Sequence, residues 1–203
     1  MTPAPALTAD VITERLRAAV ATAGLADLGP VGEQAAGDVA LDAETTQDLL
    51  TVTVPPRAWV AALACAHDDL DCGFFDWLTG VDELDAGIAV LAHVYSLAGR
   101  HHLLLRTLLA GEPRLGTATG IYRGAAWHER ETHEMFGVVF EGHPGLDPLL
   151  LPDGFEQVPL RKNFVLAARR ERDWPGAKEP GEQEGARGRR RPPPGIHDGW
   201  PAS

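Results

Sequence analysis

The chain has 203 residues, of which 44% are apolar, and a formal net charge of −11 at pH 7. This length suits one domain with an appendage, and the apolar fraction is enough for a hydrophobic core. The negative charge disfavours nonspecific binding to nucleic acid, no apolar run approaches the roughly 20 residues of a membrane helix, and the first residues lack a secretion signal. We therefore expect a soluble, cytoplasmic protein.

Cysteine is nearly absent, and the two that occur are Cys65 and Cys72. Two thiolates are too few for a four-ligand iron–sulfur cluster, and their spacing fits no zinc knuckle. Both are expected to be small, partly buried residues. Because motifs for a nucleophile elbow, a phosphate-binding loop and a dinucleotide site are also missing, we expect no cofactor in this chain.

The first half of the chain mixes helical and strand patterns. Residues 9–23 form a predicted amphipathic helix, and residues 48–54 alternate like a half-buried strand with Leu50, Val52 and Val54 on one side. A second helix is predicted over residues 57–67, after two prolines that end the strand. The apolar stripes of the two helices are predicted to be Val11, Ile12, Leu16, Ala19 and Val20 in the first, and Trp59, Val60, Leu63 and Ala64 in the second.

Three further strands are predicted near residues 74–78, 88–97 and 102–109, with Gly99-Arg100 as the turn of a hairpin. A third helix follows over residues 124–136. Tight turns between strands indicate antiparallel pairing, so the fold class is α+β, a two-layer domain whose mostly antiparallel sheet is packed by helices.

The last 34 residues contain six prolines and six glycines. This composition is typical of irregular chain, so we divide the protein into a domain at 1–169 and an extended, irregular tail at 170–203. The tail is either disordered or ordered on partner subunits, with Trp174 and Trp200 as candidate anchors.

The third predicted helix contains the sequence HERETHEMFG, residues 128–137, which has the composition of a metal or acid–base site. Zinc on a helix requires two histidines four residues apart, whereas His128 and His133 are five apart, or about 140° around the helix. Gly137 stands where the second histidine of a zinc motif beginning at His133 would be. A local metal site is therefore disfavoured.

Two other interpretations of this helix stay open. Glu131 and Glu134 share a face and form a candidate acid–base pair, since a buried carboxyl has a raised pKa. The charges also suit a helix whose polar face is either solvated or docked on another protein. In that case Arg130 would compensate Glu134 near the helix C-terminus, and Gly137 would end the helix.

Three segments in order closely resemble one protein family. Residues 128–137 continue into FGVVFEGHP at 136–144, PLRKNF follows at 159–164, and FDWLTGVD precedes them at 75–82. Together they resemble the 30 kDa subunit family of respiratory complex I, in its bacterial form a component of NADH-quinone oxidoreductase. The chain departs from the family pattern where Glu134 replaces an Asp and Asp147-Pro148 replaces an Arg-Arg pair.

This resemblance implies a non-catalytic scaffold and assembly subunit of a proton-translocating complex that passes electrons from NADH to quinone. It implies contact with the large quinone-site subunit and with iron–sulfur subunits, on the cytoplasmic side of the bacterial membrane. FMN, iron–sulfur clusters and quinone would belong to those partners. The residues assigned to the interface are Glu129, Arg130, Glu131, Glu134, Phe136, Gly137, His143, Pro144, Pro159, Leu160, Arg161 and Lys162.

Within that set the resemblance implies different roles. The charged residues of the helix would form a polar network with the partner, Phe136 and Phe140 would anchor the following loop in the core, and His143-Pro144 would fix a turn. The alternatives are the equivalent subunit of a membrane-bound hydrogenase or other quinone-linked dehydrogenase, a metal hydrolase using His128, Glu131 and His133, and a small binding module.

Overall fold

The computed structural model describes residues 7–26, 41–47, 49–152, 154–155 and 157–164. In chain order the elements are α1 (Ala9–Ala26), β1 (Asp42–Thr46), β2 (Leu49–Thr53), η1 (Pro56–Ala58), α2 (Trp59–Asp68), β3 (Phe74–Asp82), η2 (Leu84–Ala86), β4 (Ile88–Ser96), β5 (His101–Leu109), β6 (Arg114–Gly116), α3 (Ala125–Phe136) and β7 (Val139–Glu141). The predicted tail, with Trp174 and Trp200, lies outside the described residues.

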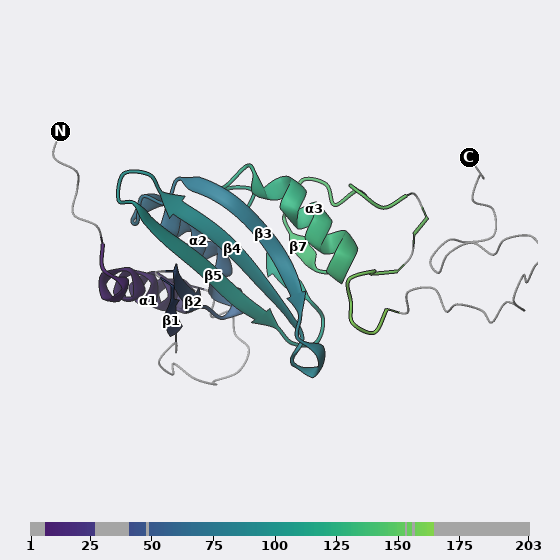
Figure 1. The fold of residues 1–203 in the computed structure, drawn as a ribbon, viewed down its shortest axis with the longest axis horizontal. Coiled ribbons are helices and arrows are strands. Elements are labelled where there is room, and N and C mark those ends of the chain that lie inside the picture. The colour runs from purple at the N-terminus through teal and green to yellow at the C-terminus, as the bar shows by residue number, and fades with distance from the viewer. Residues whose placement is uncertain (1–6, 27–40, 48, 153, 156, 165–203) are drawn as a thin grey trace, which may run out of the picture.

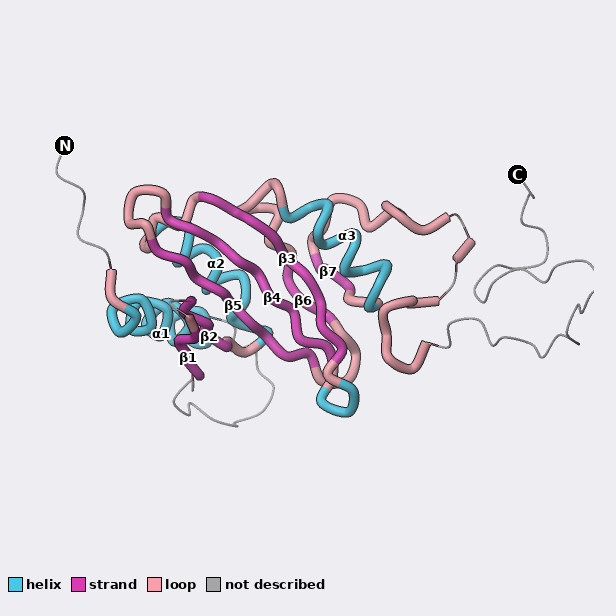
Figure 2. Tube along the Cα trace, viewed as in Figure 1, coloured by secondary structure: helices cyan, strands magenta, loops and turns pink. Residues whose placement is uncertain are grey.

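Five strands form one sheet in the order β1-β2-β5-β4-β3 (Figure 1). Neighbours pair antiparallel except β2 and β5, which run parallel, so the predicted α+β fold with a mostly antiparallel sheet is confirmed. The predicted hairpin joins β4 to β5, where Arg100 has a φ of 53° and donates its N–H to the Ser96 carbonyl at 2.8 Å. A separate parallel pair, β6 and β7, lies beside α3 (Figure 2).

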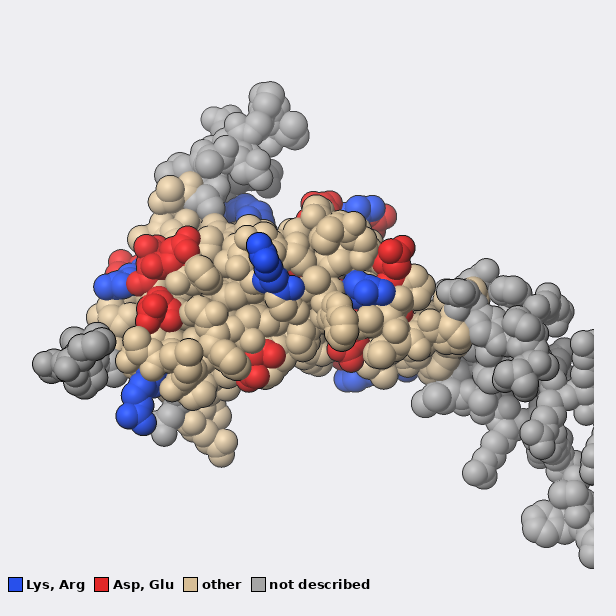
Figure 3. Space-filling view, turned by 90° about the horizontal axis from the view of Figure 1, so that it is seen from above, with Lys and Arg blue, Asp and Glu red and all other residues tan. Residues whose placement is uncertain are grey.

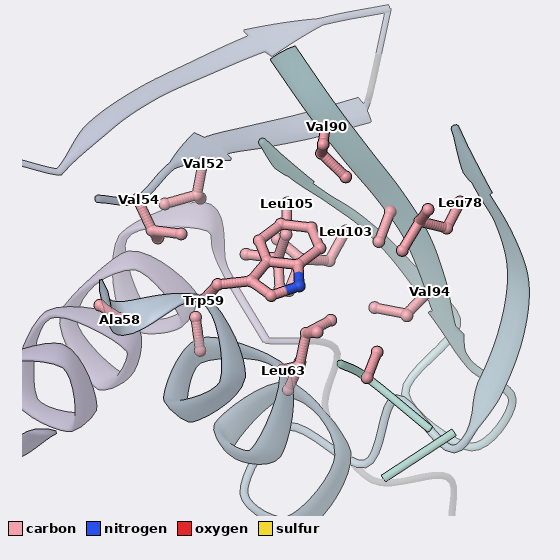
Figure 4. Close-up of a cluster of buried hydrophobic side chains, with 14 of the residues drawn as sticks. Val52, Val54, Ala58, Trp59, Leu63, Leu78, Val90, Val94, Leu103 and Leu105 are labelled. Atoms are coloured by element: carbon pink, nitrogen blue, oxygen red, sulfur yellow. The ribbon is translucent and has the colours of Figure 1, made fainter. Parts of the chain in front are cut away.

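Helices α1 and α2 cover one face of the sheet and enclose the main core. Trp59 is fully buried there, facing Leu103 and Leu105 of β5 (Figure 4). Leu50, Val52 and Val54 also point into this core, as the alternation predicts, and the two cysteines are buried. Apolar burial of this kind contributes the largest favourable term in folding.

The predicted burial of two residues on these helices is wrong. Val11 and Val60 are each 40% exposed. The buried positions of α1 are Ile12, Leu16 and Val20, and those of α2 include Trp59, Leu63 and Ala66. Val11 and Val60 each lie one residue off these stripes, so about 100° of helical rotation turns them away from the core.

Strands β1, β6 and β7 were not predicted. Every residue of β1 is exposed, and its sequence, DAETT, has little strand preference overall. Its strand conformation therefore depends on the backbone pairing with β2. The other two contain three residues each, too few to show a period. Strand β3 also runs four residues beyond its predicted end at Leu78, because residues 79–82 pair with residues 88–91 of β4.

Candidate functional site

The three sequence segments that form the family-like pattern meet around α3, at the edge of the sheet beyond β3 (Figures 1 and 2). Leu160 donates its N–H to the Met135 carbonyl at 3.1 Å, and Arg161 Nε donates to the Phe136 carbonyl at 2.7 Å. Lys162 donates its N–H to Asp82 Oδ2, at the end of β3, at 2.8 Å. Residues 80 positions apart in sequence are thus joined through the same short segment.

The C-terminus of α3 is fixed by a glycine and a histidine. Gly137 has a φ of 78°, a left-handed conformation that favours glycine, and donates its N–H to the His133 carbonyl at 2.8 Å. The helix end predicted at this residue is therefore confirmed. His133 Nδ1 lies 2.8 Å from the Val138 carbonyl and so donates to the chain just after the helix. These two hydrogen bonds direct the chain that follows α3 back toward β6, with which β7 pairs.

The buried stripe of α3 is Ala125, Glu129, Thr132 and Phe136, which follows the spacing of one helical face. Phe136 and Phe140 both belong to the core, as predicted. Phe136 packs on Gly80 of β3 so closely that a Cβ added to Gly80 would lie 2.7 Å from its ring. The absence of a side chain at Gly80 sets the distance between helix and sheet.

Arg130 and Glu134 do not pair with each other, in contrast to the predicted compensation. Arg130 donates from Nε to the Asp147 carbonyl at 2.8 Å and from a terminal nitrogen to the Pro148 carbonyl at 2.6 Å. The acceptors are backbone carbonyls, which every residue type has. The replacement of the family's Arg-Arg pair by Asp147-Pro148 therefore leaves both hydrogen bonds possible.

The Glu134 carboxylate accepts the backbone N–H groups of Leu149, Leu150 and Leu151. These donors offset the unfavourable position of an acid near a helix C-terminus. Both charged residues therefore fasten residues 147–151 to α3, and Glu134 itself is only 8% exposed. The interpretation as a solvated charged face fails at this residue.

Glu129 is fully buried, which neither interpretation of the charged face predicted. Its Oε1 accepts the Ala118 N–H at 2.6 Å, and its Oε2 lies 2.5 Å from the Thr117 hydroxyl. Burial raises the pKa of Glu129 to about 7, although the two hydrogen bonds act in the opposite direction. The raised pKa expected for a carboxyl of this helix thus occurs at Glu129, whereas Glu131 is exposed.

His143 supports the turn assigned to it. Its Nε2 lies 3.1 Å from the Ala126 carbonyl of α3, and its Nδ1 accepts the Gly145 N–H at 3.0 Å. Pro144 is exposed beside it. The side chain of His143, rather than the proline alone, attaches this turn to the helix.

Asp82 joins β3 to the segment at 159–162. Its carboxylate accepts the N–H groups of Lys162 and Leu84, at 2.8 and 2.9 Å. These bonds lower the pKa of Asp82 below its ordinary 3.8, with smaller contributions from the charges of Arg161 and Lys162. Such a carboxyl adds stability above its unfolded pKa, and this contribution is lost as the pH falls through the folded value.

We therefore expect the protection of the Lys162 amide against hydrogen exchange to fall at acid pH, below the ordinary pKa of an aspartate. Asp82→Ala should give low protection at every pH, because alanine has no side-chain acceptor for the Lys162 N–H. Amide exchange followed by NMR across the acid range measures both. Equal protection of Lys162 in the two proteins at neutral pH would contradict this role.

The residues of the hydrolase interpretation are engaged separately. His128 packs edge-on against Phe75 with ring centroids 5.6 Å apart, His133 bonds the Val138 carbonyl, and Glu131 points to solvent. Among the described residues, no three histidine, cysteine or acidic side chains are grouped to hold a metal ion. In the same part of the chain no helix is both long and apolar enough to cross a membrane.

Residues 52–170 match the sequence profile of the family described as respiratory-chain NADH dehydrogenase, 30 Kd subunit. The chain belongs to this family. One relative, an NADH-quinone oxidoreductase subunit of Rhizobium meliloti, is 34% identical over 146 residues, a match that covers 70% of this chain and 73% of the relative. The corresponding subunit of Roseiflexus castenholzii is 40% identical over 124 residues, covering 59% and 71%.

A solved structure of an archaeal respiratory complex, the membrane-bound sulfane sulfur reductase, contains a chain with a similar fold. The TM-score is 0.57 at 22% identity, over 71% of this chain and 88% of the other. At this identity the likeness concerns the fold alone. A fold like that of the 30 kDa subunit thus occurs in more than one kind of respiratory membrane complex.

Sequence reasoning missed several residues that organise this site. Thr117 and Thr119 lie in a short polar stretch without a pattern, and nothing in the sequence indicates that they reach Glu129. Glu129 was assigned to the interface by the resemblance, and only its burial was missed. That burial carried a usable signal, because Glu129 falls on the same helical face as Thr132 and Phe136. Asp82 lies within the family-like segment at 75–82, yet no contact was predicted for it.

Proposed function

We propose that this protein is a scaffold and assembly subunit of a membrane-bound NADH–quinone oxidoreductase. Its docking surface would consist of the outer side of α3, the loop at 143–151 and the segment at 159–162. The large quinone-site subunit would bind there, with iron–sulfur subunits nearby. Membership of the 30 kDa subunit family and the convergence of its sequence motifs on this one surface support the proposal.

Exposed apolar side chains support a protein partner at this surface. Trp127 on α3 is 70% exposed, Leu150 in the loop 61%, and Leu160 in the following segment 54%. Each is carried by backbone that is fastened to α3 or belongs to it. Large apolar groups on a rigid polar frame are typical of protein interfaces, where tryptophan and arginine contribute most of the binding energy.

Neither sign of charge dominates the face of the protein drawn in Figure 3. Most of that face is uncharged, and its acidic side chains gather mainly at the left of the view. Arg161 and Lys162 are the basic pair predicted to meet acidic groups on the partner. Arg161 Nε is engaged with Phe136, whereas Lys162 is exposed, so we assign the pairing with a partner mainly to Lys162.

In this proposal the chain carries no redox centre. Electrons would pass from NADH through FMN and iron–sulfur clusters of neighbouring subunits to quinone, and proton translocation would occur in the membrane arm. The protein would lie on the cytoplasmic side of the membrane and contact it only through the complex. The role of this chain is to position its neighbours.

A second candidate is the equivalent subunit of a related complex with another electron donor, which the fold shared with the sulfane sulfur reductase favours. Affinity purification of the chain in mild detergent, with identification of the co-purifying subunits, tests both. We expect a large quinone-site subunit and iron–sulfur subunits, together with an NADH-oxidising subunit. Hydrogenase or sulfur-reducing partners would select the second candidate, and a chain that purifies alone would contradict both.

Arg130→Ala is expected to reduce the yield of assembled complex more than it reduces the stability of the chain. Losing two hydrogen bonds from a partly exposed charge costs about 1 kcal/mol, or roughly 3 °C in Tm. The loop that Arg130 holds at the interface would lose its preformed geometry, so we expect about fivefold less complex. Co-purified partner per tagged chain and thermal unfolding of the chain measure the two effects.

Arg123→Ala is the matched control, since Arg123 is exposed just before α3. It should leave both quantities unchanged. If Arg130→Ala lowered yield only as far as its loss of stability explains, Arg130 would serve the fold and not the interface.

A further inference from the structure

Glu129 is an acid buried without a cation. It is fully buried, and among the described residues the one basic side chain within 4.0 Å of its carboxylate is His143, whose Nε2 lies 4.0 Å from Oε2. Both side chains are almost completely inaccessible, at 0% and 2% exposure. An ionised carboxylate in such a place would carry a large desolvation cost.

The hydrogen bonds of His143 fix its charge state. The Ala126 carbonyl can only accept, so Nε2 carries a hydrogen, and the Gly145 N–H can only donate, so Nδ1 carries a lone pair. His143 is therefore the neutral imidazole with its proton on Nε2. It offers no positive charge to balance an ionised Glu129.

The other ionisable side chains on the elements around Glu129 are directed elsewhere. Arg114 of β6 pairs with Glu141 of β7 at the surface, at 3.8 Å, and Arg130 and Glu134 hold the loop at 147–151. Glu131 is exposed, and the two histidines of α3 make the contacts with Phe75 and Val138. None of these groups compensates a charge on Glu129.

Two threonine hydroxyls complete the site. Thr117 Oγ1 lies 2.5 Å from Glu129 Oε2 and 2.9 Å from Thr119 Oγ1, and both threonines are partly exposed. A protonated Glu129 would donate a hydrogen bond to Thr117 Oγ1, and the Thr117 hydroxyl would in turn donate to Thr119 Oγ1. The Ala118 N–H donates to Glu129 Oε1. Every polar atom of a neutral acid then has a partner.

We propose that Glu129, Thr117 and Thr119 form a buried proton-binding site that opens to solvent through the threonine hydroxyls. The proton resides on Glu129 at acid pH, and its loss as the pH rises loosens the turn at 143–145. Once ionised, Glu129 attracts the hydrogen of His143 Nε2, which lies 4.0 Å from Oε2, away from the Ala126 carbonyl. A ring turned in this way moves Nδ1 away from the Gly145 N–H, so the bond that closes the turn is weakened.

The raised pKa of Glu129, about 7, agrees with this geometry. Because the folded protein holds the proton more tightly than the unfolded chain, stability falls as the pH rises from the ordinary value of 4.5 through about 7, and is constant above it. The expected change in the unfolding equilibrium is on the order of a hundredfold.

The direct test is a ¹³C NMR titration of the full-length chain labelled at the glutamate carboxyl carbon. We expect one resonance, absent in Glu129→Gln, with a midpoint near 7. Thr119→Val should keep the midpoint but slow proton exchange, giving two resonances or a broadened one at the midpoint. A Glu129 midpoint below about 5 would overturn the proposal, and unaltered exchange in Thr119→Val would overturn the threonine path.

The turn is tested separately. Protection of the Gly145 amide should fall in the wild-type chain as the pH rises through the Glu129 midpoint, and it should stay constant in Glu129→Gln, whose amide imitates the protonated acid. Chemical denaturation at about pH 5 and about pH 8 should show the roughly hundredfold change in the wild type alone. Parallel behaviour of the two proteins in either measurement would overturn the coupling. These tests use the isolated chain and remain decisive whichever complex it joins.

Discussion

Replacing Gly80 by valine is expected to lower the free energy of unfolding by about 3 kcal/mol. The new Cβ would lie 2.7 Å from Cδ2 and 3.0 Å from Cγ of Phe136, both rigid ring atoms of a buried side chain. Neither the ring nor the strand can move without separating α3 from β3. Urea denaturation measures the loss, and we expect a matching fall in assembled complex.

Two variants test the physical cause. Gly120→Ala adds a methyl group where nothing lies within 4 Å and should change the stability by less than about 0.5 kcal/mol. Phe136→Leu makes room beside Gly80, so the double variant should be more stable than the sum of the two single losses predicts. Strict additivity of the two changes would show that the contact between Gly80 and Phe136 is not the origin of the effect.

Replacing Glu134 by alanine is expected to release the loop at 147–151 from α3. The carboxylate accepts three successive backbone N–H groups, and hydrogen bonds to a charged group contribute about 1.5–3 kcal/mol each at most. Since water replaces part of this in an opened loop, we expect a net loss of about 2 kcal/mol, confined mainly to the loop. Amide exchange of Leu149, Leu150 and Leu151 should accelerate about thirtyfold.

Glu131→Ala is the control on the same helix, because Glu131 is exposed. Glu134→Gln should fall between the wild type and Glu134→Ala, since it keeps one acceptor oxygen and loses the charge. Global unfolding should change less than the loop exchange does. If all three leucine amides stayed protected in Glu134→Ala, the loop would be held by packing and not by this carboxylate.

The sequence determined the elements whose pattern is long and periodic. The alternation at 48–54, the hairpin turn at residue 100 and the end of α3 at Gly137 follow from local physics, namely side-chain period and backbone conformation. The ordered family motifs also identified the family, because each retains its residue types at similar spacing. Strands of three residues, and the exposed β1, have too little local preference to be found without their partners.

The partners of the charged residues on α3 were decided only by the tertiary structure. The spacing of Arg130 and Glu134 along one helix suggested a pair, yet both are used by a loop that follows later in the chain, at 147–151. Glu129 resembles its exposed neighbour Glu131 in sequence and differs from it entirely in environment. A side chain's hydrogen-bond partners and burial depend on what folds against it, so the chemistry of this helix follows from packing that no local pattern encodes.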